Sequence, residues 1–455
     1  MSTLASQTHF TQVVNRLEHI AYLHRACAQI QAGWNVKLNE MEYKLSLASH
    51  TFDDMEQVAK LDRHLVALTR VDSYQGTIPV AWMHALKQLD REANQSTMIS
   101  GIYHVIKPYL ATLYNQLLNQ LDPILDINLK RVLNHYMPLL RQQIAWANDQ
   151  ETPSDHPLLN SLTQVLQQPQ GESLPRQEGI WQPQDRVNRA VRPENMPRAT
   201  PGALRLLPKN AWTDPQGIGL AAHNQIHGEF TTMELMSRCL YEHPDMPAAF
   251  HLDMARHASD ESRHARIFME LAALYDVQYG DYPVYTLTYD AYYEFDPACS
   301  IGSKQELLWR LILRGTIDEG LALDDLAYQA KSRDFLDQQK FANACRYILA
   351  DETFHVQGAL KWSRYLCDRN EEQVTQQRET ARQFLNTKLC ERRLAYEQQH
   401  AKQVEEELAY RREVAAAERP EIPYTRVLNR SARMAAGYTE ADINQVLKWG
   451  YADAK

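Results

Sequence analysis

Long stretches of the chain place apolar residues three and four positions apart, which is the spacing of one face of an α-helix. The segment LLWRLILRGTIDEGLALDDLAYQA is a clear example of this pattern. Glycine, which weakens helices, supplies only 16 of the 455 residues. We therefore predict an all-α protein.

The N-terminal third of the chain, residues 1–150, reads as a helical domain. Breaks are expected at its glycines and prolines, near Gly33, from Gly76 to Pro79, and around Pro108 and Pro123. The next stretch, residues 151–216, is dense in proline, glutamine and arginine and cannot hold a long helix. We predict a connector there, and with it a domain boundary.

Residues 217–366 read as four helices in two hairpins. The hairpins turn at EHPDMP and at KSRDF, and the predicted helices span 217–242, 248–275, 305–331 and 336–366. A long connector rich in tyrosine and proline joins the hairpins. Two hairpins and one long crossover form the connectivity of ferritin-like four-helix bundles. Residues 367–455 are predicted to be a polar helical extension, with Thr439 capping a small last helix.

Composition limits the location of the protein and the classes of site it can carry. No run of about 18 apolar residues occurs, and the first twenty residues lack the features of a secretory signal. The six cysteines are scattered without a CxxC pair, which predicts free thiols and argues against a zinc ribbon or an iron-sulfur cluster. The net charge of -9 argues against nucleic acid as a partner. We predict a cytoplasmic protein that contacts no membrane.

Three copies of Glu-x-x-His occur, a spacing that puts both side chains on one face of a helix. They are Glu261 with His264, Glu352 with His355, and Glu397 with His400. About one copy is expected by chance in a chain of this composition. The third copy lies in a segment that is polar on all sides, so we interpret it as a solvated helix face.

Two lone glutamates match the first two copies. Glu261 follows Glu229 by 32 residues, and Glu352 follows Glu319 by 33 residues, so each pair is centred on a predicted turn. A dinuclear site in a four-helix bundle takes one glutamate from each of two helices and Glu-x-x-His from each of the other two. The spacing predicts a dinuclear metal site, and buried ion pairs with a structural role are the alternative.

Glu234 competes with Glu229 as the ligand from the first helix. It lies about 140° around the helix from Glu229, so both side chains cannot face one pair of ions. Arg238, four residues on, offers Glu234 a surface salt bridge. The 32-residue spacing favours Glu229.

Carboxylates and imidazoles suit iron or manganese. Asp260 and Asp351 each precede a ligand glutamate, and we expect each to accept the second ring N–H of the histidine on the facing helix. Thr232 and Thr316 lie three residues from a ligand and are candidates for binding a metal-bound oxygen species, although helical threonines more often bond to their own backbone. Gly228 and Gly315 leave room for a substrate.

Several other side chains have a simpler interpretation. The tyrosines of the connector between the hairpins are expected to pack that connector, with a substrate mouth as the alternative. They are Tyr279, Tyr282, Tyr285, Tyr289, Tyr292 and Tyr293. His223 and His227 share a predicted helix with Glu229, and we expect them to be core or rim histidines.

The segments HGEFTTMEL, DESRH, IDEG and DETFH together resemble the ferritin-like di-iron carboxylate superfamily. Rubrerythrins, ribonucleotide reductase small subunits and multicomponent monooxygenases belong to it. The run from HGEFTTMEL to YGDYPV is similar to a bacterial branch related in pattern to tRNA hydroxylases. The resemblance covers residues 217–366. It implies two iron ions held by Glu229, Glu261, His264, Glu319, Glu352 and His355, with dioxygen as co-substrate.

These features predict a di-iron oxygenase or oxidase that acts on a small-molecule or carrier-bound substrate and takes electrons from a donor. A manganese–iron pair is the alternative metal content. An iron-storage or ferroxidase protein and an RNA-modifying hydroxylase are the alternative functions. The N-terminal domain has no Glu-x-x-His of its own, and a decayed bundle that serves dimerisation (as a homodimer) or substrate docking is one interpretation of it.

Overall fold

A computed structural model describes most of the chain. The described residues are 9–69, 77–92, 94–150, 154–168, 172–175, 181–182, 190–197, 212–284, 302–399, 401–402, 405, 409, 427–448 and 452–453. Nearly all of their regular structure is helical, so the protein is all-α as predicted.

The chain forms two compact units. Unit 1 comprises residues 1–187 and 236–259, and unit 2 comprises residues 188–235 and 260–455. The division into four parts that the sequence suggests stays a prediction.

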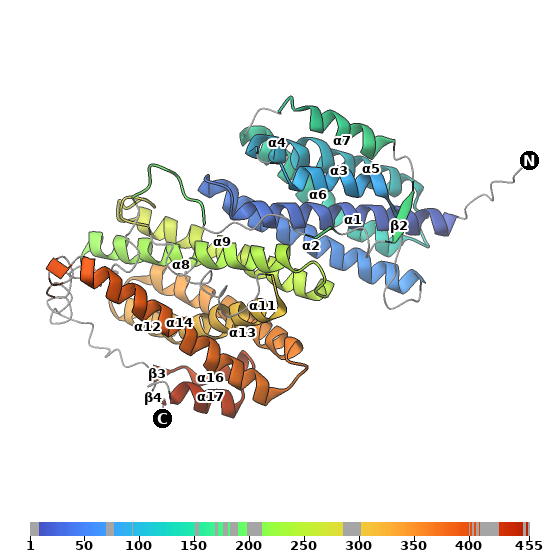
Figure 1. The fold of residues 1–455 in the computed structure, drawn as a ribbon. Coiled ribbons are helices and arrows are strands. Elements are labelled where there is room, and N and C mark those ends of the chain that lie inside the picture. The colour runs from blue at the N-terminus through green and yellow to red at the C-terminus, as the bar shows by residue number, and fades with distance from the viewer. Residues whose placement is uncertain are drawn as a thin grey trace, which may run out of the picture. The chain divides into compact units, whose positions relative to one another are not determined.

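Unit 1 is built mainly from long helices, shown in blue to green in Figure 1. Helix α1 packs along α2, α5 packs along α6, and the two pairs are joined by contacts of α1 with α5 and of α2 with α6. A short antiparallel pair, β1 (Thr77–Pro79) with β2 (Ser173–Pro175), lies beside them. The helices are α1 (His9–Asn35), α2 (Met41–Thr69), α3 (Val80–Asp90), α4 (Gln95–Ser100), the π-helix η1 (Gly101–Ile106), α5 (Lys107–Gln120), α6 (Ile127–Gln150) and α7 (Pro157–Gln167).

The predicted breaks in unit 1 are only partly right. Pro123 lies in the loop between α5 and α6, and α1 ends at Asn35, two residues after Gly33, so both of these breaks are confirmed. No break occurs at Pro108, which is in the first turn of α5 directly after the π-helix η1. The helical backbone runs without interruption from η1 into α5, so Pro108 lies inside a continuous helical segment. Within the predicted connector, α7 forms a helix of 11 residues.

Unit 2 holds the N-terminal part of α8, the C-terminal part of α9 and the helices that follow residue 302. A polar helix, α14, follows the hairpin of α12 and α13 as expected (Figure 1). The elements are α8 (Pro215–Glu242), α9 (Ala248–Ala273), α11 (Lys304–Arg310), the π-helix η3 (Leu311–Asp318), α12 (Glu319–Phe335), α13 (Gln339–Leu366), α14 (Glu371–Gln399), β3 (Val427–Leu428), α16 (Arg430–Ala435), α17 (Glu440–Leu447) and β4 (Ala452–Asp453).

The third predicted helix has a π-helical centre. Segment η3 lies between α11 and α12 and ends at the residue before Glu319. A Cβ atom on Gly315 would lie 2.4 Å from that of Ala359, so η3 and α13 approach closely here. Gly315 therefore leaves no room for a substrate, contrary to our expectation. The turn at KSRDF is also misplaced, because α12 runs to Phe335 and the chain reverses around Asp337, which has a φ of 56°.

The C-terminal segment packs on the α12–α13 hairpin. Buried residues of α12 and α13 form a core with residues near α16 and α17, including Leu323, Val356 and Tyr438. Thr439 caps α17 in a capping box with Asp442, which confirms the predicted small last helix. β3 and β4 pair in parallel beside it.

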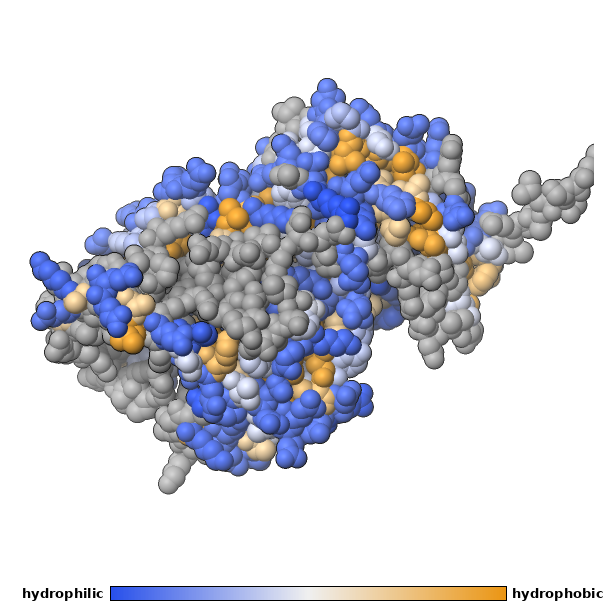
Figure 2. Space-filling view, in the orientation of Figure 1, coloured by the Kyte–Doolittle hydropathy of each residue, from blue (hydrophilic) through white to orange (hydrophobic). Residues whose placement is uncertain are grey.

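The described thiols of Cys27, Cys239, Cys345 and Cys367 are free and buried, as predicted. Cys299 and Cys390 lie outside the described residues. Most of the coloured residues on the face shown in Figure 2 are hydrophilic, and the hydrophobic ones among them form small separate groups. Among the described helices, none is both long enough and apolar enough to cross a membrane.

Candidate metal centre

Four helices carry the six predicted ligands in unit 2. Glu229 lies on α8, and α9 carries Glu261 with His264. Glu319 is the first residue of α12, directly after the π-helix, and α13 carries Glu352 with His355. The arrangement of one lone glutamate and one Glu-x-x-His in each hairpin is the arrangement predicted from the spacing.

The six side chains form two groups that share two carboxylates. In one group, ligand atoms of Glu229, His264, Glu261 and Glu352 lie within 4.8 Å of one another. In the other group, Glu319 and His355 join the same two glutamates, Glu261 and Glu352, within the same limit. Two adjacent groups that share two glutamates are the arrangement that we predicted for a dinuclear site.

Distances around the two histidines support this geometry. Nδ1 of His264 lies 3.7 Å from Oε2 of Glu229, 3.7 Å from Oε2 of Glu261 and 3.6 Å from Oε1 of Glu352. These distances are too long for hydrogen bonds. Three carboxylates thus surround one ring nitrogen at a spacing that leaves room for an ion among them.

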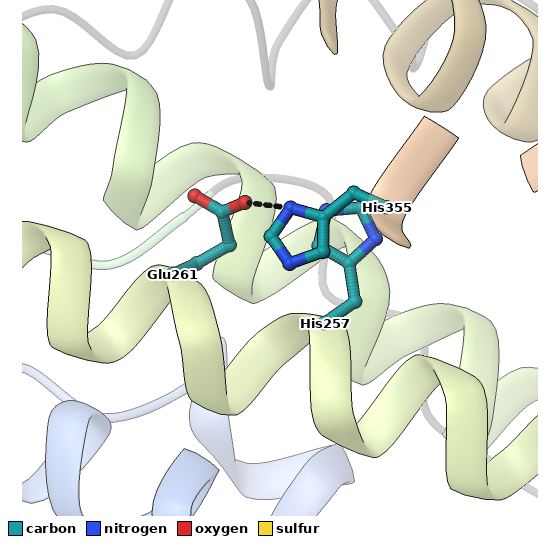
Figure 3. Close-up of side chains that lie close together, drawn as sticks. All are labelled: His257, Glu261 and His355. Carbon is teal, nitrogen blue, oxygen red and sulfur yellow. Dashed lines mark ion pairs between the residues drawn. The ribbon is translucent and has the colours of Figure 1, made fainter. Parts of the chain in front are cut away.

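The second histidine makes closer contacts. Nδ1 of His355 lies 3.1 Å from Oε1 of Glu261, the ion pair drawn in Figure 3, and 2.9 Å from Oε2 of Glu352. Both histidines therefore turn Nδ1 toward the glutamates and leave Nε2 for a partner on the opposite side.

Sequence analysis missed His257. This residue lies one turn before Glu261 on α9 (Figure 3), and it forms a third group with Glu261 and His355. The spacing His-x-x-x-Glu puts both side chains on one helix face and is the signal that could have revealed it.

Two aspartates support the histidines from outside the group. Nε2 of His264 lies 3.2 Å from Oδ2 of Asp351, and Nε2 of His355 lies 3.4 Å from Oδ2 of Asp260. These are the pairings between facing helices that we expected. Arg263 donates hydrogen bonds to Asp260 at 3.0 Å and Asp351 at 2.6 Å. One arginine thus holds both aspartates in place.

Burial and the neighbouring charges raise the pKa values of two glutamates and of one histidine in the site. Burial and the nearby Glu261 raise the pKa of Glu229 to about 8. Burial and the carboxylates of Glu319 and Glu261 raise the pKa of Glu352 well above its ordinary value. Burial opposes the charged form of His264. The hydrogen bond to Asp351 and the interactions with the neighbouring glutamates nevertheless raise its pKa. In the absence of metal, burial and the neighbouring carboxylates thus favour the protonated forms of Glu229 and Glu352.

The two threonines bond to their own backbone. Thr232 donates to the carbonyl of Gly228 at 3.0 Å, and Thr316 donates to the carbonyl of Ile312 at 2.5 Å. Thr232 also accepts a hydrogen bond from Nε of Arg314 at 2.6 Å. The same nitrogen lies 3.1 Å from Oε1 of Glu319, so Arg314 links Thr232 to a candidate ligand.

Glu234, the competing candidate, points away from the ligands. Its carboxylate forms a fully buried ion pair with Arg192, at 2.5 Å and 3.0 Å. Arg238, the partner suggested by the sequence, forms an ion pair with Glu242. Arg192, distant in sequence, reaches the face of α8 that carries Glu234.

His223 and His227 are buried core histidines, as expected. The ring of Tyr279 lies 5.5 Å from that of His223 and stacks on Phe230 at 5.3 Å, so this tyrosine packs the connector. Tyr285, Tyr289, Tyr292, Tyr293, His400 and the side chain of Glu397 lie outside the described residues.

A family model described as "Protein of unknown function (DUF455)" matches residues 159–444. The chain belongs to this family. The DUF455 match contains all six candidate ligands, both aspartates and most of the C-terminal segment that packs on α12 and α13. Neither the curated proteins nor the solved structures gave a match.

Proposed function

We propose that this DUF455 protein is a di-iron oxygenase or oxidase whose site lies in a ferritin-like four-helix bundle formed by α8, α9, α12 and α13. The observation that carries the proposal is the pair of four-residue groups that share Glu261 and Glu352. Such a set of four glutamates and two histidines suits iron or manganese.

The charge of the site favours two divalent ions. Four glutamates with side chains no more than 12% exposed would carry four negative charges in a helical core. Burying uncompensated charges is strongly unfavourable. Two divalent cations would neutralise the four carboxylates, and protons take their place in the metal-free chain.

The chain's own residues would then have distinct tasks. Glu261 and Glu352, which belong to both groups, would hold both ions, while Glu229 with His264 would hold one ion and Glu319 with His355 the other. Asp351 and Asp260 would keep the histidines in the tautomer that presents Nδ1 to the metal. Iron bound there would supply the electrons and the binding position with which dioxygen is converted into an oxidant for an organic substrate.

The exposed fractions of the ligand side chains indicate that the site is most accessible from the side of Glu229. Its side chain is 12% exposed and that of Arg314 is 14% exposed, whereas those of the other five ligands are between 0% and 3% exposed. A Cβ atom added to Gly228 would meet no other atom within 4 Å. We propose that the substrate approaches along this side.

Anaerobic loading with ferrous iron tests the proposal. About two ions per chain are expected, with oxygen consumption and an optical change on exposure to air. Glu261→Ala and Glu352→Ala should abolish this uptake, whereas His400→Ala, in the third Glu-x-x-His, should retain it. Full iron binding by the two glutamate variants would disprove the site. Mineralisation of many more than two ions per chain would instead support an iron-storage protein.

A further inference from the structure

A buried polar cluster surrounds Lys107 in unit 1. Its Nζ donates to Oδ2 of Asp54 at 2.8 Å and to Oε1 of Gln143 at 2.5 Å. Oδ1 of Asp54 lies 2.8 Å from Nδ1 of His24 and accepts a hydrogen bond from Tyr136 at 2.7 Å. All five residues are between 0% and 2% exposed. The ammonium group is therefore a fixed cation inside a helical core.

Lys107 occupies the same place in its helix as Glu319. Each is the first α-helical residue after a π-helical segment, η1 before Lys107 and η3 before Glu319. π-Helical turns are rare and are frequently found at functional sites. Two such segments in one chain, each ending at the charged residue of a buried cluster, indicate a repeated structure.

The sequence around Asp54 supports the same repeat. The segment His50-x-x-Asp53-Asp54-x-x-Gln57 matches His257-x-x-Asp260-Glu261-x-x-His264 position by position. The first two positions of the motif hold the same residue in both segments, a histidine and an aspartate. The third position holds a carboxylate in both, and the fourth holds an amide in unit 1 where unit 2 has an imidazole. Both segments lie on the second helix of a hairpin, α2 or α9.

The remaining positions follow the same order. His24 precedes Asp54 by 30 residues, as Glu229 precedes Glu261 by 32. Gln143 and Trp146 lie on α6 with the three-residue spacing of Glu352 and His355 on α13. Six positions of unit 1 therefore correspond to the six candidate ligands of unit 2. The counterparts of Glu229, Glu261, His264, Glu319, Glu352 and His355 are, in the same order, His24, Asp54, Gln57, Lys107, Gln143 and Trp146.

We infer that unit 1 is a second copy of the four-helix bundle in which the ammonium group of Lys107 stands where a metal ion would be held. Three glutamate positions have become His24, Lys107 and Gln143, so fewer negative charges remain to be neutralised. A lysine ammonium is a compact charge with three donors, and it satisfies the remaining oxygens without an exchangeable ion. The comparison rests on the metal centre proposed for unit 2.

This origin has a consequence that an ordinary buried ion pair lacks. If the cluster derives from a metal site, removing the ammonium should leave oxygens of Asp54 and Gln143, and the imidazole of His24, arranged to accept a divalent ion. Asp53, whose carboxylate accepts a hydrogen bond from Gln143 at 2.8 Å, would add a further ligand.

The test uses full-length Lys107→Ala with manganese, cobalt or zinc. The variant should melt at a lower temperature than the native chain, and metal should restore much of this loss and add about one bound ion per chain. Lys44→Ala is the matched control, because Lys44 is also 0% exposed in unit 1 and donates to the carbonyls of Asn35 and Val36. Its stability should fall without restoration by metal.

Two further variants keep the test decisive. If Lys107→Ala does not fold, refolding with metal should recover it, and Asp54→Asn in the same chain should abolish that recovery. A Glu261→Gln/Glu352→Gln background removes the proposed centre of unit 2, so ions taken up through Lys107→Ala are counted separately. Equal behaviour of the Lys107 and Lys44 variants with metal would overturn the inference.

Discussion

The phenol of Tyr438 donates a hydrogen bond to the backbone carbonyl of Thr316, in the π-helix that ends immediately before Glu319. Nη2 of Arg433 donates to the carbonyl of Gly320 at 2.6 Å, on the other side of Glu319. A Cβ atom on Gly320 would lie 2.6 Å from the Tyr438 hydroxyl. The C-terminal segment thus holds the backbone on both sides of a candidate ligand.

Tyr438→Phe should weaken both the fold and the metal centre. The loss leaves a buried carbonyl without this donor, which costs about 1–3 kcal/mol in the free energy of unfolding. Because Thr316 precedes Glu319 by less than one turn, we expect metal affinity to fall as well, measured by titration of the metal-free protein. Tyr347→Phe on α13, where the residue is 71% exposed, is the control. Unchanged metal affinity in Tyr438→Phe would show that the contact serves stability alone.

Asp351→Asn should lower metal affinity by about 10-fold to 100-fold, the usual effect of losing a carboxylate that orients a metal-binding histidine. The asparagine keeps the shape of the side chain but removes the charge that faces Nε2 of His264. Asp334→Asn, at an ion pair with Arg346 in which the two side chains are 34% and 47% exposed, is the control. Equal metal affinities in the two variants would contradict the role of Asp351.

The metal-free protein should lose stability as the pH rises from about 4.5 to about 8. The pKa of Glu229 is raised from 4.5 to about 8, chiefly by burial, so the folded state binds its proton more tightly than the unfolded state. This contribution is complete below pH 4.5 and is lost as the pH passes the folded-state pKa. Denaturation in chelator across this range measures it. Glu229→Gln should flatten the profile, and an unchanged profile would refute the assignment.

Removing one partner of the Arg192–Glu234 pair should cost about 3–5 kcal/mol in the free energy of unfolding, since the other charge is left buried and uncompensated. Arg192→Met and Glu234→Gln each test this by chemical denaturation. The exposed pair of Arg346 and Asp334 should contribute at most about 1 kcal/mol. Glu234→Gln should still bind metal, whereas Glu229→Ala should not, and the reverse result would exchange their assignments.

Much of the fold was predicted from the spacing of apolar residues along the chain. Periodic apolar residues placed most helices of unit 2 within a few residues of their observed ends, because burial of one face imposes that period. The failures lie at Pro108 and at the turn after α12. In both places a π-helix or a longer helix continued through a segment that resembles a break, since packing against neighbouring helices outweighs local preference.

The sequence by itself determined the all-α class and the choice of six side chains, because spacings of three residues and matched hairpin lengths follow directly from helix geometry. Only the tertiary structure decided which carboxylates are shared between the two groups, and that Arg192, 42 residues away, pairs with Glu234. The tertiary structure also revealed the hydrogen bond from Tyr438 to the carbonyl of Thr316 and the polar cluster around Lys107 in unit 1. These contacts join residues tens of positions apart, and their geometry depends on how whole helices pack, which no local spacing encodes.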